Sequence, residues 1–150
     1  IGGIDFDTNT IIINSAIESH LGRYSFTIAH EIAHHVLHRD LFLKARSGDS
    51  IMCRGGEVRP IEEVQADRFA EALLMPISTI VNNCKKANGF IGYSRRRRLA
   101  LAAKAIKLTG INNVSVSAME MRLMHLGYLP PYNSNIRRTL KAVRARFLAS

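Results

Sequence analysis

Hydrophobic residues recur along this chain with two periods, and each period predicts one type of secondary structure. Ile4-Asp5-Phe6, in which apolar and polar residues alternate, and the apolar run at residues 11–13 flank the polar residues 7–10. This pattern predicts a strand, a turn and a second strand. Between residues 28 and 38, apolar side chains instead fill one arc of a helical wheel, from about 160° to 340° when His30 is set at zero. We therefore expect a β-hairpin followed by a helix that buries one face.

A second helix is predicted within residues 61–76, because apolar residues recur there at the spacing i, i+3, i+4 and i+7. These residues are Ala66, Phe69, Ala70 and Leu73. Pro76 ends the helix, since the residue before a proline disfavours helical backbone angles. Residues 39–60 contain three glycines among polar residues and are expected to form the loop between the two helices.

The second half of the chain, residues 77–150, is predicted to be helical with interruptions. A helix is expected from residue 95 to about residue 109, capped by Ser94 and stopped at Gly110. The first half, residues 1–76, would then hold the two helices and the hairpin described above. The chain length suits one domain, or one domain with a small appendage.

Two further helices are predicted towards the carboxyl end. Residues 117–120 have the form of a capping box and open a short helix that ends at Gly127. With the helix before it, this helix makes a segment at about residues 98–127 that looks like a helix-turn-helix. The tail at residues 135–149 has an apolar stripe with arginines and lysine around it, which predicts a basic amphipathic helix.

From the composition, neither a membrane-spanning protein nor a secreted, disulfide-stabilised protein is expected. No apolar run approaches the roughly 20 residues needed to cross a bilayer, and no signal-peptide pattern is present. Cys53 and Cys84 are too few for a disulfide framework, so a reducing cytoplasm is expected. Since the chain begins at Ile1 rather than at a methionine, we expect residues upstream of it.

The formal net charge of +9 is spread unevenly. Residues 1–76 hold 7 Lys/Arg and 11 Asp/Glu, a balance of −4, whereas residues 77–150 hold 14 Lys/Arg and one acid, a balance of +13. Such asymmetry steers a polyanion or an acidic protein towards one half. The densest run of cations is a candidate partner or nucleic-acid site and comprises Arg95, Arg96, Arg97 and Arg98. A solvated helix start is the alternative, and direct DNA binding is expected to be weak.

The first predicted helix carries the chemistry. His30 and His34 lie four residues apart, so both imidazoles project from one side of a helix and can bind one metal ion. Glu31 lies about 100° around the helix from His30. This HExxH arrangement supplies two zinc ligands and a carboxylate that can take a proton from the metal's water. A polar surface helix is the alternative, but solvated faces usually carry Lys, Glu and Arg rather than several histidines.

The third ligand is expected from the second helix. His38 is rejected because it lies about 12 Å along the axis from His30. Glu63 can complete a His2Glu site and leave the fourth position to water, as a catalytic zinc requires. Asp67 lies four residues further along the same face and can accept the second ring N–H of a ligand histidine. Ordinary surface acids are the alternative for both residues.

Three blocks in this order resemble the ImmA/IrrE metallopeptidases. The first block runs from Arg23 to His38, the second is Glu63-x-x-Ala66-Asp67-x-Phe69-Ala70, and the third is Leu-Leu-Met-Pro at 73–76. The resemblance covers about residues 3 to 130. It departs at Ala33, where glycine is common, and at Gln65, where a second glutamate often stands. The resemblance implies a zinc-dependent protease that cuts a helix-turn-helix repressor and so relieves repression, often after stress.

Taken together, the sequence predicts an α+β fold in which a small N-terminal hairpin packs on a zincin-like helical core. The predicted function is that of a cytoplasmic zinc endopeptidase, with Zn²⁺ held by His30, His34 and Glu63, and Glu31 as general base. A donor for the tetrahedral oxyanion is also expected, and the candidates are Tyr24, Tyr93, His125 and Tyr128. The hairpin either receives the substrate backbone by edge pairing or only covers the core. The alternative function is a DNA-binding regulator without enzymatic activity, whose zinc site is structural or vestigial.

Overall fold

The computed structural model describes residues 2–46, 60–84 and 95–129. The chain divides after Leu74 into two compact units. Most described residues are helical, and two strands form a small antiparallel sheet, which fits the expected α+β class. No helix in these three ranges is long and apolar enough to cross a membrane.

The first unit begins with the predicted hairpin. Strands β1 (Gly2–Asp5) and β2 (Thr10–Ile13) pair antiparallel, with Gly2 opposite Ile13 and Asp5 opposite Thr10. The expected strand at residues 4–6 is therefore placed too late, since Phe6 belongs to the turn. The turn needs the left-handed backbone angle of Asn9, with φ of 53°, a conformation that asparagine tolerates better than most residues.

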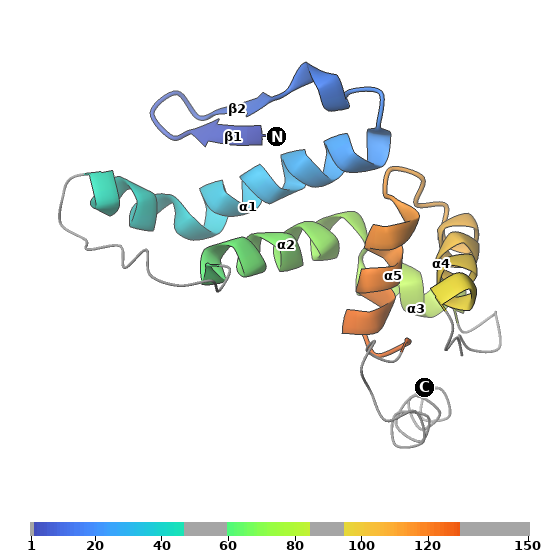
Figure 1. The fold of residues 1–150 in the computed structure, drawn as a ribbon. Helices are drawn as coiled ribbons and strands as arrows, with labels where there is room; N and C mark the ends of the chain where they lie inside the picture. Colours follow the sequence, from blue (N-terminus) through green and yellow to red (C-terminus); the bar gives the residue numbers. More distant parts are fainter. Residues whose placement is uncertain (1, 47–59, 85–94, 130–150) are drawn as a thin grey trace. The chain divides into compact units, whose positions relative to one another are not determined.

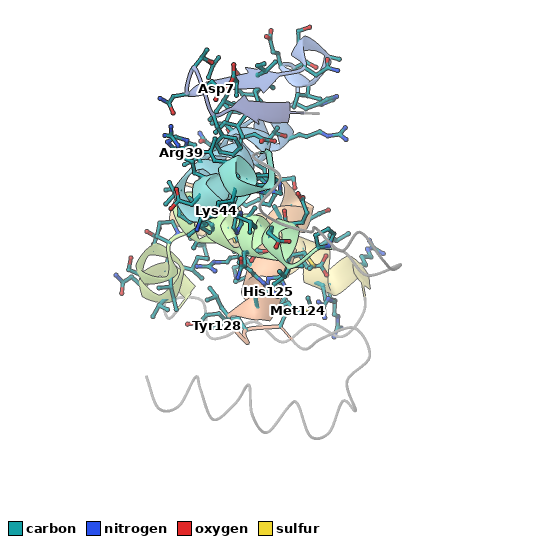
Figure 2. The ribbon with its side chains drawn as sticks, turned by 90° about the vertical axis from the view of Figure 1, so that its left-hand side faces the viewer. Asp7, Arg39, Lys44, Met124, His125 and Tyr128 are labelled. Carbon is teal, nitrogen blue, oxygen red and sulfur yellow. The ribbon has the colours of Figure 1, made fainter. Side chains whose placement is uncertain are left out.

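Side chains fix this turn in place. The Asp5 carboxylate accepts hydrogen bonds from the Asp7 N–H at 2.9 Å and from the Thr8 hydroxyl at 2.8 Å. Arg39, below Asp7 in Figure 2, donates to the Asn9 side-chain oxygen at 3.0 Å and to the Phe6 carbonyl at 3.3 Å. The guanidinium thus ties the end of the hairpin to the long helix beneath it.

Two helices complete the first unit. After a short 3-10 turn, η1 (Ser15–Ile17), comes α1 (Leu21–Arg46), and α2 (Ile61–Leu74) packs along it. The hairpin lies along one side of α1 and α2 along the other (Figure 1). The predicted loop at residues 39–60 is wrong for residues 39–46, because Leu41, Phe42 and Leu43 continue the helix before the first glycine of that segment.

Small side chains form the contact between α1 and α2. Ala29 and Ala33 on α1, and Ala66 and Ala70 on α2, are all at most 2 % exposed. The separation of two packed helices depends on the size of the side chains between them, and alanines permit a short one. The backbone of α2 therefore runs close to the face of α1 that carries the histidines.

The second unit contains α3 (Ile77–Cys84), α4 (Arg95–Thr109) and α5 (Val116–His125). Helix α4 ends at Thr109 and Gly110 follows with φ of 72°, as expected. The cap of α5 is Ser115, whose hydroxyl accepts from the Ala118 N–H at 3.1 Å, so the predicted capping box at residues 117–120 is wrong. Ser94 and the predicted tail helix at residues 135–149 lie outside the described residues.

Glu120 lies beyond the first turn of α5, and its partner is an arginine of α4. Its carboxylate accepts from Arg98 Nε at 2.6 Å, and both side chains are at most 5 % exposed. A second nitrogen of Arg98 lies 3.6 Å from Met124 Sδ. Arg98 thus joins α4 to α5 in the core, whereas Arg96 and Arg97 are exposed. Of the candidate surface run at residues 95–98, Arg98 is not available to a partner.

Arg98→Ala should lower the free energy of unfolding by about 3–5 kcal/mol, because it leaves the Glu120 carboxylate buried without its cation. Chemical denaturation measures this loss. Arg96→Ala is the matched control, since this arginine is exposed on the same helix, and its effect should stay within about 0.5 kcal/mol. Replacing the pair together, as Arg98→Met with Glu120→Leu, should recover most of the loss; equal losses in all three variants would contradict this account.

Candidate metal centre

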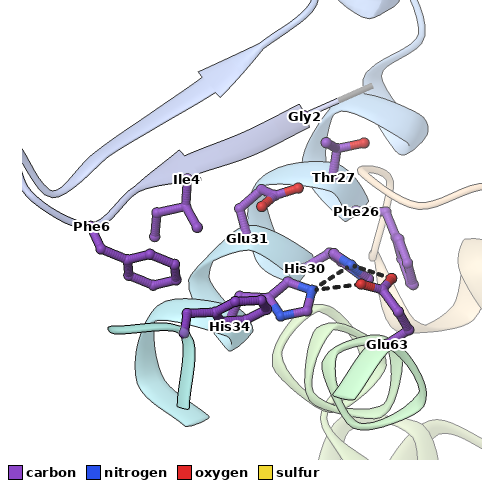
Figure 3. Close-up of a pocket in the computed structure, with 10 residues that line it drawn as sticks. Gly2, Ile4, Phe6, Phe26, Thr27, His30, Glu31, His34 and Glu63 are labelled. Carbon is purple, nitrogen blue, oxygen red and sulfur yellow. Dashed lines mark hydrogen bonds and ion pairs between the residues drawn. The ribbon is translucent and has the colours of Figure 1, made fainter. Parts of the chain in front are cut away.

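The histidine face of α1 and the first turn of α2 bring three possible ligands together. His30 Nε2 and His34 Nε2 lie 3.0 Å apart, one helical turn from each other on α1. The Glu63 carboxylate on α2 lies 3.3 Å from each of these nitrogens, through its two different oxygens. Figure 3 shows the two rings and the carboxylate converging on one point. The sequence named these three residues as the ligands, and the structure places them together.

The spacing of these atoms fits a tetrahedral zinc ion. Zinc binds histidine nitrogen and carboxylate oxygen at about 2.0–2.2 Å, so ligand atoms at the corners of a tetrahedron lie about 3.3–3.6 Å apart. The donor atoms of His30, His34 and Glu63 lie 3.0–3.3 Å apart, close to this separation. One possible ligand atom from each of His30, His34 and Glu63 lies within 4.8 Å of the other two, and these residues are called the ligand group below. The donor set is that of a site with three protein ligands and one open position.

Each histidine is held by a polar group behind it. His30 Nδ1 lies 2.9 Å from an Asp67 carboxylate oxygen, the contact that the sequence expected of Asp67. His34 Nδ1 lies 3.1 Å from His38 Nδ1, on the side of the ring that faces away from Glu63. Both ligand rings therefore turn Nε2 towards the centre and Nδ1 towards a partner.

The electrostatics of His34 favour metal binding. Burial lowers the pKa of this imidazole, and the neighbouring His30 lowers it further, while the Glu63 carboxylate acts in the opposite direction. The ring is therefore neutral at pH 7, and a neutral imidazole has the lone pair that a metal ion needs.

Glu31 lies outside the ligand group but lines the same cavity. Its side chain points from α1 towards β1 rather than towards Glu63 (Figure 3). The residue is only 8 % exposed, and burial raises the pKa of its carboxyl group above the ordinary value. His30 lowers this pKa and Glu63 raises it, but burial has the largest effect. A carboxylate with a raised pKa accepts a proton more readily, as a general base requires.

The cavity holds about 580 Å³ and has a polar floor and apolar walls. The floor is formed by the ligand group, Glu31 and Thr27. The walls are formed by hairpin residues on one side and helix residues on the other, namely Gly2, Ile4, Phe6, Phe26 and Phe42. The hairpin thus forms a wall of the cavity. Whether it also pairs with a substrate backbone or only covers the core stays open between the two roles expected of it.

Aromatic contacts hold one end of the cavity in shape. The Phe6 ring stacks on Phe42, with centroids 5.5 Å apart, and on His35 at 6.3 Å. Phe42 also meets the His34 ring edge to face at 5.6 Å. Sequence reasoning missed these wall residues. A signal was present for Phe26 and Phe42, because they continue the four-residue spacing of His30 and His34 in both directions along α1.

The candidate oxyanion donors are not brought together by the described structure. Tyr24 lies on α1 but not among the residues that line the cavity. His125 and Tyr128 belong to the second unit, and Tyr93 lies outside the described residues. The donor stays a prediction.

The model of the M78 peptidases, described as the IrrE N-terminal-like domain, matches residues 2–86. The chain belongs to this family. The expected resemblance to the ImmA/IrrE metallopeptidases is therefore confirmed, and the match covers every residue of the ligand group. No curated protein and no solved structure matches the chain.

In this M78 peptidase, Gly2 lets β1 approach α1 closely at the cavity. A Cβ atom at this position would lie 2.6 Å from the Thr27 methyl carbon and 3.1 Å from a Glu31 carboxylate oxygen. The Thr27 methyl belongs to a stiff, β-branched side chain, so the strand would have to move. Gly3, the next residue of the same strand, has no atom within 4 Å of such a Cβ.

Gly2→Ala should therefore destabilise the protein by about 1–3 kcal/mol through overpacking, as measured by chemical denaturation. Gly3→Ala is the control and should be neutral. Adding Thr27→Ser, which removes the methyl group in the way, should restore most of the loss caused by Gly2→Ala. If the two glycine variants were equally stable, the close approach of β1 to α1 would be refuted.

Glu31→Gln should make the metal-free protein more stable at neutral pH. Because the folded-state pKa of Glu31 is raised, the ionised carboxylate disfavours the folded state at any pH above that pKa. The advantage of the glutamine should shrink as the pH falls, and vanish below about 4.3, where the carboxyl is protonated in the folded and unfolded states alike.

Denaturation curves of the metal-free proteins between pH 4 and pH 8 measure this dependence. Glu18→Gln, at an exposed position outside the cavity, is the control and should follow the wild-type curve. A gain that is the same at every pH would show that burial of the Glu31 charge is not its cause.

Proposed function

We propose that this chain is a zinc-dependent endopeptidase. The observation that carries the proposal is the triangle of His30 Nε2, His34 Nε2 and the Glu63 carboxylate, with sides of 3.0–3.3 Å, beside the buried Glu31. Membership of a peptidase family supports the same reaction class. His30, His34 and Glu63 would hold the ion.

Zinc bound there would supply an acidified water and polarise the carbonyl of the scissile peptide bond. Glu31 is the base that takes the proton from the attacking water and then delivers it to the nitrogen of the leaving amine. Its burial suits both halves of this task, since the raised pKa lets the carboxyl hold the proton between the two steps. Asp67 keeps the His30 ring in place by accepting its Nδ1–H.

The walls of the cavity support a peptide substrate rather than a small polar one. Ile4, Phe6 and Phe42 line the cavity with apolar surface, and Glu31 within it is only 8 % exposed. Water exclusion strengthens every electrostatic interaction inside the site. From the family resemblance we further propose that the substrate is a helix-turn-helix repressor, whose cleavage relieves repression.

A DNA-binding regulator with a structural zinc site is the alternative, and two observations favour the enzyme over it. Structural zinc sites usually close with four protein ligands, whereas the group found among the described residues has three. The helix that would enter a DNA groove, α5, exposes Val116, Ser117 and Met121, which carry no charge. Its arginine, Arg122, is half-buried and donates from Nε to the Met75 carbonyl oxygen at 3.0 Å. DNA recognition depends on cationic contacts to phosphate.

Glu31→Gln should abolish cleavage of a helix-turn-helix repressor substrate while zinc content stays near one ion per chain. The amide cannot accept a proton, yet Glu31 is not in the ligand group. Mass spectrometry of the products and metal analysis of the same sample measure the two quantities. Retained cleavage would exclude Glu31 as the base.

Glu63 and Glu62 provide a matched pair on α2. Glu63→Ala should lower zinc affinity and cleavage together, because it removes one of three ligands. Glu62→Ala, one residue away and outside the ligand group, should lower neither by more than about threefold, equivalent to about 0.6 kcal/mol. The reverse order would move the third ligand to Glu62. A wild-type protein that cleaves equally well after a chelator has removed its metal would exclude a metallopeptidase altogether.

A further inference from the structure

His38 is a buried polar residue that the proposed mechanism does not use. It lies on α1 one turn beyond His34 and is only 5 % exposed. Its two ring nitrogens both have partners: Nδ1 lies 3.1 Å from His34 Nδ1, and Nε2 lies 2.9 Å from the Gln65 side-chain oxygen on α2. The three side chains form a hydrogen-bonded chain that starts at a proposed zinc ligand and ends at the exposed Gln65.

Such a chain of two imidazoles can hold its protons in two ways. Each neutral ring carries one N–H, and the nitrogen atoms that face each other share a single proton. In one arrangement His34 donates from Nδ1 to His38, and His38 donates from Nε2 onwards. In the other arrangement both donations are reversed, and the proton of His34 then lies on Nε2, where it blocks metal binding.

The group at the far end of the chain fits the first arrangement. Gln65 presents its carbonyl oxygen to His38 Nε2, and a carbonyl oxygen can only accept. His38 must then carry its proton on Nε2 and leave Nδ1 free to accept. His34 Nδ1 becomes the donor, and the lone pair of His34 Nε2 points at His30 Nε2 and Glu63.

We propose that His38 is a positioning residue for the metal site, which fixes the tautomer and orientation of His34 through the chain His34–His38–Gln65. The proposal rests on the proposed zinc site. It assigns to His34 the same kind of support that Asp67 gives to His30, but from a neutral group instead of a carboxylate. His38 lies behind the His34 ring, so it supports a ligand without being one.

Packing restrains the His34 ring from the other side. The Phe42 ring meets His34 edge to face at 5.6 Å and His38 in the same manner at 6.5 Å. A ring that is confined by packing and by one hydrogen bond loses little freedom when it binds an ion. Removal of a group that orients a metal ligand typically lowers metal affinity about 10–100-fold.

The test compares three variants by zinc affinity, measured by competition with a chromophoric chelator. His38→Phe keeps a ring but accepts no hydrogen bond, so zinc affinity should fall about 10–100-fold. His38→Asn places an amide oxygen near the position of Nδ1 and should restore affinity to within about threefold of wild type, or about 0.6 kcal/mol. His35→Phe is the control. His35 stacks on Phe6 and is not part of the chain, and a phenyl ring keeps this stacking, so the variant should bind zinc like wild type.

Kinetics separates positioning from loss of fold. At saturating zinc, His38→Phe should regain kcat near the wild-type value with KM unchanged, since the ligands and Glu31 are intact. Zinc affinity of His38→Phe within twofold of wild type would overturn the proposal. So would equal losses in His38→Phe and His38→Asn, because the acceptor would then be irrelevant.

Nitrogen NMR of the zinc-loaded wild-type protein tests the same chain without any substitution. His38 should carry its proton on Nε2 and His34 on Nδ1, and a proton on His38 Nδ1 would overturn the proposal. The two proposals fail in distinguishable ways. A protein that binds zinc through this chain but cleaves no peptide bond contradicts only the proposed function, whereas a peptidase indifferent to His38 contradicts only the positioning role.

Discussion

The contact between α1 and α2 is the constraint on which the metal centre depends. His30 and His34 are placed by one helix alone, but Glu63, Asp67 and Gln65 reach them only because α2 runs close alongside. Alanines buried on both helices permit that short separation. A larger side chain at Ala33 or Ala66 would therefore act on the site through distance, without touching a ligand. The glycine that is common at position 33 in the family satisfies the same requirement.

Burying the ionised Glu31 carboxylate destabilises the fold, and other contacts of the first unit have to offset this loss. Burial raises the pKa of Glu31, so the ionised base is held in the folded state against its preference for water. The close approach of β1 at Gly2 maintains that burial, and Arg39 ties the hairpin to α1 at the other end. The hairpin is small as a sheet, yet it determines the environment of the Glu31 carboxylate, the proposed base.

Much of the site was predictable because its elements are local. A four-residue spacing places His30 and His34 on one face of a helix whatever the tertiary structure, and the same spacing places Glu63 beside Asp67. The cavity walls were not predictable, since Phe6 reaches Phe42 only through the turn of the hairpin. The run at residues 95–98 gave no sign of which arginine is buried, because that depends on Glu120 in another helix. The capping-box prediction failed for a local reason, because the helix begins two residues earlier than expected, with Ser115 as its cap.

The two supports of the ligand histidines differ in charge, and that difference suits the chemistry. Asp67 already brings a carboxylate to His30, and Glu63 is a second one beside Glu31. Burial raises the pKa of Glu31 most, and the negative charge of Glu63 raises it further. A further carboxylate behind His34 would act in the same direction and would hinder ionisation of the base at neutral pH. The imidazole of His38 orients His34 by hydrogen bonding and adds no negative charge to the cavity.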